Sequence, residues 1–76
     1  MTQKDWLEDF GYNLSDLMKD AGITQKELSK RTGIEQSNLS RYMKGQQTPS
    51  VKTVMNLAYE LDCNYEDLLG FADRID

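Results

Sequence analysis

The chain has 76 residues and a formal net charge of −4, with one cysteine and no histidine. This length predicts a single small domain, since such a chain buries only about 60% of the surface that its unfolded form exposes. The single cysteine excludes an internal disulfide. With one cysteine and no histidine the chain offers few metal ligands, so we expect no metal site and no cofactor. No apolar run approaches the roughly 20 residues that a membrane span needs, and the polar N-terminus is unlike a secretory signal. A cytoplasmic location and no membrane partner are therefore expected.

The first predicted helix ends at Gly22 and carries apolar residues at helical spacing. Gly11 interrupts this pattern and costs about 1 kcal/mol relative to alanine, so we expect the first turns to fray or kink there. Asn13 or Ser15 can cap a restarted helix, and the pattern does not choose between them. Ile23 is expected to pack onto the following helix. The apolar positions of the pattern are Trp6, Leu7, Phe10, Leu14, Leu17, Met18 and Ala21.

The next segment predicts two short helices joined by a tight turn. Thr24 and Glu27 have the spacing of a capping box, and Gly33 can adopt the positive φ that ends a helix. Ile34 then anchors the turn, and the second helix has one apolar side and one polar side. This arrangement is typical of a helix-turn-helix motif, whose second helix reads the major groove of DNA. The apolar side holds Leu39, Tyr42 and Met43, and the polar side holds Glu35, Gln36, Ser37, Ser40, Arg41 and Lys44.

Two further helices are predicted after a loop that ends at Pro49. Ser50 is a suitable N-cap for the first of them, and Asn64 for the second. We expect Cys63, between them, to be a small buried hydrophobe rather than a reactive thiol. The prediction is an all-α fold of five short helices in one domain, residues 1–76, with a core over about 5–71 and a loose tail at 72–76. The apolar stripe of the fourth helix is Val51, Val54, Leu57, Ala58 and Leu61, and the last helix carries Tyr65, Leu68, Leu69 and Phe71.

Charge is unevenly distributed along the chain. Residues 24–48 have a net charge of +3, whereas residues 1–23 carry −3 and residues 49–76 carry −4. A phosphate responds mainly to nearby cations, because the Debye length is about 8 Å at physiological salt. The one basic segment therefore coincides with the predicted helix-turn-helix, which favours duplex DNA as the partner.

The run from about Leu14 to Gly70 resembles the lambda-repressor-like family of helix-turn-helix regulators, also called the Cro/C1 or XRE type. The resemblance implies base contacts from Gln36, Ser37 and Arg41 on the third helix. The matching residues are Gly22-Ile23-Thr24-Gln25, Glu27-Leu28, Gly33-Ile34, Gln36-Ser37, Leu39-Ser40, Gly45, Pro49-Ser50, Leu57-Ala58, Leu61 and Leu68-Leu69-Gly70. The phosphate contacts that we predict with the family's pattern in view are Gln25, Lys26, Ser40, Lys44, Gln46, Gln47 and Thr48.

The chemistry of these side chains agrees with the resemblance. Glutamine can bind adenine N6 and N7 together, and the guanidinium of arginine matches guanine O6 and N7. Glu35 either accepts from cytosine N4 or points into solvent. The sequence departs from the family's pattern in two respects. Ser29 replaces a frequent alanine at the helix crossing, and Met18 with Met43 replaces a frequent Arg–Glu pair, so no charge is left stranded.

The sequence predicts a DNA-binding transcriptional regulator that represses, with no cofactor and no small-molecule substrate. The alternative is a protein-interaction module of the same fold, such as an antitoxin or adaptor, which the acidic flanks favour. An enzyme is not expected, since no nucleophile–base pair or phosphate-binding loop occurs. One domain reads too few base pairs to select a genomic site, so we expect a homodimer on a roughly palindromic site. The interface candidates are Tyr65, Leu68, Phe71 and Ile75. The alternative is that Leu68, Leu69 and Phe71 close the core.

Overall fold

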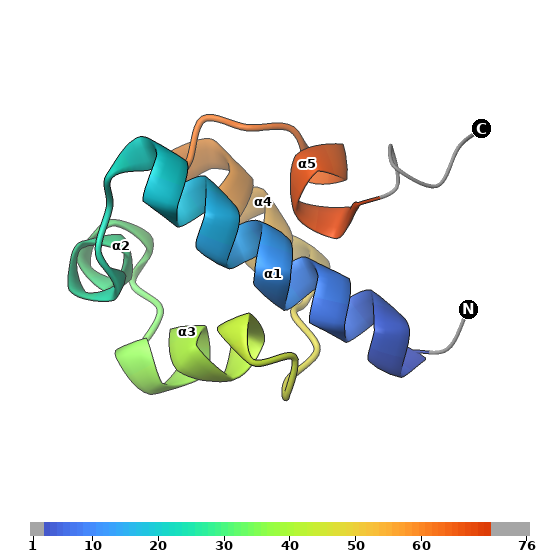
Figure 1. Ribbon diagram of the computed structural model, residues 1–76. Helices are drawn as coiled ribbons and strands as arrows, with labels where there is room; N and C mark the ends of the chain where they lie inside the picture. Colours follow the sequence, from blue (N-terminus) through green and yellow to red (C-terminus); the bar gives the residue numbers. More distant parts are fainter. Residues whose placement is uncertain (1–2, 71–76) are drawn as a thin grey trace.

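Five α-helices make up the regular structure of residues 3–70 (Figure 1). The computed structural model describes residues 3–70, and no strand occurs between them. The predicted all-α fold of five helices is therefore confirmed. The predicted loose tail, Phe71 and Ile75 lie outside the described residues. The helices are α1 (Gln3–Ala21), α2 (Gln25–Thr32), α3 (Gln36–Met43), α4 (Val51–Glu60) and α5 (Tyr65–Leu69).

A single hydrophobic core joins all five helices. In Figure 1, α3 and α5 lie on opposite sides of α1, with α4 behind it, and α2 lies beyond the C-terminal half of α1. Phe10 of α1 meets the edge of the Tyr42 ring of α3, with ring centroids 6.1 Å apart. Such edge-to-face contacts add to the stability that burial provides. The buried apolar residues are Phe10, Leu14, Met18, Leu28, Leu39, Tyr42, Val54, Leu57, Ala58, Leu61 and Leu68.

The predicted break in the first helix is wrong. Helix α1 runs without interruption past Gly11, so neither Asn13 nor Ser15 acts as a cap. A Cβ atom at Gly11 would lie 2.5 Å from the carbonyl oxygen of Met43, so only glycine allows this approach of α1 to α3. Asn13 instead donates from Nδ2 to the carbonyl oxygen of Leu68, at 3.0 Å, and ties α5 to α1.

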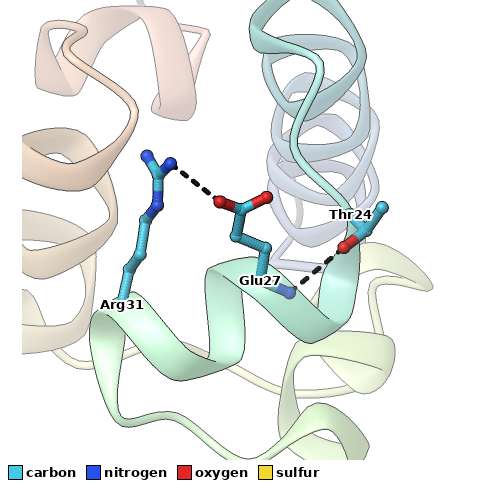
Figure 2. A network of polar contacts seen from close by, with 3 residues as sticks. All are labelled: Thr24, Glu27 and Arg31. Carbon is cyan, nitrogen blue, oxygen red and sulfur yellow. Dashed lines mark hydrogen bonds and ion pairs between the residues drawn. The ribbon is translucent and has the colours of Figure 1, made fainter.

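The predicted ends of the first two helices are confirmed, with one change. Gly22 follows α1 with φ 68°, and Thr24 caps α2 by accepting a 3.1 Å hydrogen bond at Oγ1 from the backbone N–H of Glu27. The Glu27 carboxylate forms an ion pair with Arg31 at 2.9 Å instead of completing the capping box (Figure 2). Arg31 lies one turn further on the same face of α2, and this spacing favours the pair.

The caps of α4 and α5 also match the sequence. Ser50 accepts from the backbone of Thr53, and Asn64 forms a reciprocal capping box with Asp67. The predicted apolar stripe of α4 is wrong at its first member, because Val51 is 77% exposed. Val51 belongs to a second row of residues that is turned away from the core, described below.

Candidate nucleic-acid interface

The connection between α2 and α3 is held by side chains of α2. Gly33 adopts φ 78°, and its N–H donates to the carbonyl of Ser29 at 2.9 Å. The N–H of Ile34 donates to Oγ1 of Thr32 at 3.1 Å, while the hydroxyl of Ser29 donates to the carbonyl of Ile34. Both backbone polar groups of Ile34 are therefore bound to α2, so the start of α3 is fixed relative to α2. The serine at the helix crossing thus contributes a hydrogen bond to the turn.

Helix α3 has one buried side and one exposed polar side. Leu39 and Tyr42 lie in the core, whereas Gln36, Ser37 and Arg41 are exposed. These three positions fall at the spacing of one helix face, together with the half-buried Ser40. The structure therefore brings the predicted base-reading side chains together on one accessible face. Glu35 is the exposed N-cap of α3 and makes no side-chain capping bond.

Asn38 holds the side chain of Arg41, a contact that the sequence reasoning missed. Nη1 of Arg41 donates to Oδ1 of Asn38 at 3.0 Å. The two residues lie three apart on α3, a spacing at which helix side chains meet, so their order in the sequence could have indicated the pair. The bond uses one of the five guanidinium donors and leaves four for other partners.

Two of the predicted phosphate-contacting residues, Gln25 and Gln47, contact the last turn of α3. Gln25 is the first residue of α2, and its Nε2 lies 3.2 Å from Sδ of Met43. Nε2 of Gln47 donates to the hydroxyl of Tyr42 at 3.4 Å. These contacts order Gln25 and Gln47. Lys26, Lys44, Gln46 and Thr48 are exposed.

The electrostatics favour an anion on this side of the molecule. Glu27, one of two acidic residues in the basic segment, is compensated by Arg31, and both side chains are about half exposed. Helix α2 therefore presents Lys26 and Lys30 without a net repulsive charge from Glu27. Lys26, Lys30, Arg41 and Lys44 are all exposed and are the other cations of the basic segment.

Metal and thiol chemistry find no support in the described part of the chain. Residues 3–70 hold no group of three or more histidine, cysteine or acidic side chains that could bind a metal ion. Cys63 is half-buried against the core, and burial raises the pKa of its thiol, with Asp67 and Asp62 adding to the effect. The thiol therefore stays protonated at neutral pH, which agrees with its prediction as a small hydrophobe. No helix in this region has the length and hydropathy needed to cross a membrane.

A family model described as the Cro/C1-type HTH DNA-binding domain matches residues 13–74. The chain belongs to this family. The predicted recognition is thereby confirmed, and the α2–α3 unit is the helix-turn-helix of a DNA-binding domain. A search of curated proteins gives no match.

Solved structures with the same fold include three bacterial regulators. The restriction-modification controller protein C.AhdI from Aeromonas hydrophila has 29% sequence identity and a TM-score of 0.78, with 82% of this chain and 94% of that chain covered. An HTH_3 family transcriptional regulator from Vibrio cholerae has 18% identity and a TM-score of 0.86, with 96% and 41% covered. The clp gene regulator ClgR from Corynebacterium glutamicum has 23% identity and a TM-score of 0.82, with 91% and 73% covered.

The dimer candidates of this Cro/C1-type chain need one correction. Leu68 is fully buried, so it closes the core and offers no surface to a partner. Helix α5 ends before Phe71, and Phe71 and Ile75 lie outside the described residues. Tyr65 remains a candidate, because it is 50% exposed.

A row of exposed apolar side chains on α4 extends the surface around Tyr65. Val51, Met55 and Tyr59 follow one another at intervals of four and are 77%, 50% and 82% exposed. We call these three residues and Tyr65 the α4–α5 patch. A groove of about 290 Å³ beside the patch is also lined by Trp6, Pro49, Val54 and Leu69. The spacing of four is visible in the sequence. The row was not predicted, because the sequence pattern places Val51 in the core stripe.

Proposed function

We propose that this Cro/C1-type protein is a sequence-specific transcriptional regulator that places α3 in the major groove of duplex DNA and represses. The supporting observation is the accessible face of α3, where Gln36, Ser37 and Arg41 project from a helix whose start is fixed by the Ser29–Ile34–Thr32 hydrogen bonds. A protein bound in this way occupies the groove and excludes competitors, which favours repression. Such a regulator acts in the cytoplasm.

Each exposed side chain of α3 has a chemical role in this proposal. Gln36 pairs with adenine through N6 and N7, and Arg41 pairs with guanine through O6 and N7. Ser37 can serve either kind of base and so discriminates less. Asn38 keeps the guanidinium of Arg41 close to the helix, which reduces the conformational entropy that Arg41 loses on binding.

The phosphate contacts come from both sides of the last turn of α3. Gln25 and Lys26 lie in the first turn of α2, where free backbone N–H groups favour an anion. Lys44 and the loop residues Gln46, Gln47 and Thr48 supply the other group, with Ser40 between them. These contacts fix the register of the protein on the duplex without reading its sequence.

We further propose that two copies bind one operator through the α4–α5 patch. In Figure 1, α5 lies on the side of α1 that is opposite to α3, so a partner seated on α5 leaves the reading helix free. A two-fold interface of this kind predicts a roughly palindromic operator with half-sites about one helical turn apart.

Selection of bound duplexes from a random pool tests the proposal, followed by affinity measurements on the selected site at increasing salt. We expect an enriched site and an affinity that falls as salt rises. A plot of the logarithm of the association constant against the logarithm of the salt concentration should have a slope of about −0.9 for each phosphate neutralised. An affinity that is absent at low salt, or unchanged from low to high salt, contradicts the proposal. That result would favour the protein-interaction module, for which the acidic flanks and the α4–α5 patch would be the relevant surfaces.

A further inference from the structure

A half-buried amide of α4 contacts the end of α2. Nδ2 of Asn56 donates to the carbonyl oxygen of Thr32 at 2.8 Å. Thr32 is the last residue of α2, and the last carbonyls of a helix lack a partner within that helix. Asparagine is unfavourable in a helix interior unless its side chain has a bond to make, and here the bond crosses to another helix. Asn56 and Thr32 are both half-buried.

Thr32, whose carbonyl oxygen accepts from Asn56, also makes hydrogen bonds within the turn through its hydroxyl. Oγ1 of Thr32 donates to the carbonyl of Leu28 at 2.8 Å and accepts from the N–H of Ile34 at 3.1 Å. Because Ser29 binds the carbonyl of Ile34, α2 and the start of α3 form one hydrogen-bonded unit. A displacement of the end of α2 is therefore transmitted to α3.

Helix α4 follows directly from the loop that carries the predicted phosphate contacts Gln46, Gln47 and Thr48. The other predicted phosphate contacts, Gln25 and Lys26, are at the start of α2. The orientation of α2 relative to α4 thus sets the distance between the two groups of contacts, with α3 between them in sequence. We propose that Asn56 is a positioning residue for DNA binding, which acts by holding the helix-turn-helix unit in its orientation on α4. This inference rests on the proposed function.

The chain contains a matched control for this contact. Asn13 also donates from Nδ2 to a backbone carbonyl near the end of another helix, that of Leu68 in α5, at 3.0 Å. This bond joins α1 to α5 and involves no residue of the α2–α3 unit. Leucine has the same number of side-chain heavy atoms as asparagine and no charge, but it cannot donate a hydrogen bond. Asn56→Leu and Asn13→Leu therefore remove the same kind of bond at two places.

The experiment measures the affinity of both variants for a duplex with one half-site, where the α4–α5 patch is not used, at a temperature where thermal unfolding shows both to be folded. We expect Asn56→Leu to weaken binding about three- to tenfold, the range that one net hydrogen bond allows, with the order of base preferences kept. Asn13→Leu is expected to stay within about twofold of the native affinity, on the same scale. Equal losses in the two variants, or native affinity in Asn56→Leu, would overturn the inference. If leucine prevents folding, Asn56→Ala and Asn13→Ala replace the pair, since alanine preserves the helix.

A measurement without DNA separates this inference from the proposed function. Backbone residual dipolar couplings of the free protein report the orientation of α2 and α3 relative to α4. We expect these two helices to reorient together in Asn56→Leu and to keep their native orientation in Asn13→Leu. An unchanged orientation in Asn56→Leu rejects the role of Asn56, whereas a native protein that binds no duplex rejects the proposed function alone.

Discussion

At the scale of single residues, the exposed face of α3 combines side chains with different duties. Arg41 and Gln36 can read base edges, whereas Lys44, at the C-cap of α3, carries a point charge suited to a phosphate. The two kinds of contact have different consequences when they are lost, because phosphates carry no sequence information.

Substitution of these residues is expected to separate specificity from affinity. Arg41→Ala and Gln36→Ala should each cost about 1–3 kcal/mol on the preferred site and relax the base preference at one position. Lys44→Ala should weaken binding to all duplexes nearly equally. Site selection with each variant measures both effects. A changed consensus for Lys44→Ala, together with an unchanged consensus for Arg41→Ala, would contradict these assignments.

At the scale of helices, Gly11 sets the spacing between α1 and α3. The carbonyl oxygens of Tyr42 and Met43 lie 2.6 Å and 2.5 Å from the place where a Cβ would stand. Backbone atoms cannot rotate away as a side chain can, so a methyl group there forces the two helices apart. Phe10 and Tyr42, whose rings meet next to this point, would lose their contact as well.

Gly11→Ala is therefore expected to destabilise the protein, although alanine is the better helix former. Overpacking typically costs about 1–3 kcal/mol, and the upper part of this range outweighs the ~1 kcal/mol by which alanine favours a helix interior. Urea unfolding measures the difference. Tyr12→Ala is the control, since Tyr12 is 72% exposed on the same helix and should change stability by less than about 1 kcal/mol. A Gly11→Ala variant as stable as the native protein would show that α1 and α3 can separate without cost.

The comparison of Gly11 with the helix ends shows which features the sequence could predict. Thr24, Gly22, Ser50 and Asn64 act on backbone groups within a few residues, so their spacing was sufficient to place four helix boundaries. Gly11 acts through a backbone more than 30 residues away, and the same glycine looks like a weak point when only its neighbours are considered. The Asn56–Thr32 bond was invisible for the same reason, since its partners are 24 residues apart.

The candidate site was predictable to the same extent. One helix face follows from a period of 3.6 residues, so the exposure of Gln36, Ser37 and Arg41 could be foreseen. The pairing of Glu27 with Arg31 could not be foreseen, because Arg31 and the backbone of Thr24 are both local partners for the one carboxylate. Val51 was misplaced because positions 51, 54, 55, 58 and 59 of α4 are all apolar, and the pattern alone does not show which row faces the core.

At the scale of the whole molecule, the two exposed surfaces of interest lie on different helices. The exposed polar face belongs to α3, whereas the α4–α5 patch belongs to α4 and α5. Helix α3 packs mainly on α1 and α2. Single apolar side chains on a surface are ordinary, but Val51, Met55 and Tyr65 line one apolar groove, and Tyr59 continues their row on α4. In the proposed function, this arrangement leaves α3 to the DNA and the α4–α5 patch to a second copy.

A charge in the α4–α5 patch is expected to prevent assembly on DNA. In a two-fold interface Tyr59→Glu brings one carboxylate from each protomer into an apolar contact, where a desolvated charge without a partner is unfavourable. Sedimentation with the selected duplex should show two native protomers per site and one protomer of Tyr59→Glu. Tyr12 is also a highly exposed tyrosine but lies outside the patch, so Tyr12→Glu should behave as the native chain. One native protomer at saturation, on a site without inverted symmetry, would contradict the dimer.

Trp6 gives the protein an intrinsic optical reporter of this surface. It is the only tryptophan of the chain, it stacks on Phe10 with ring centroids 5.9 Å apart, and it lines the groove next to Met55 and Tyr65. Its fluorescence therefore originates from one known place, remote in sequence from the reading helix. A blue shift of the emission marks the exclusion of water from the groove. Titration of the unlabelled protein thus distinguishes occupation of the groove from occupation of α3 by DNA.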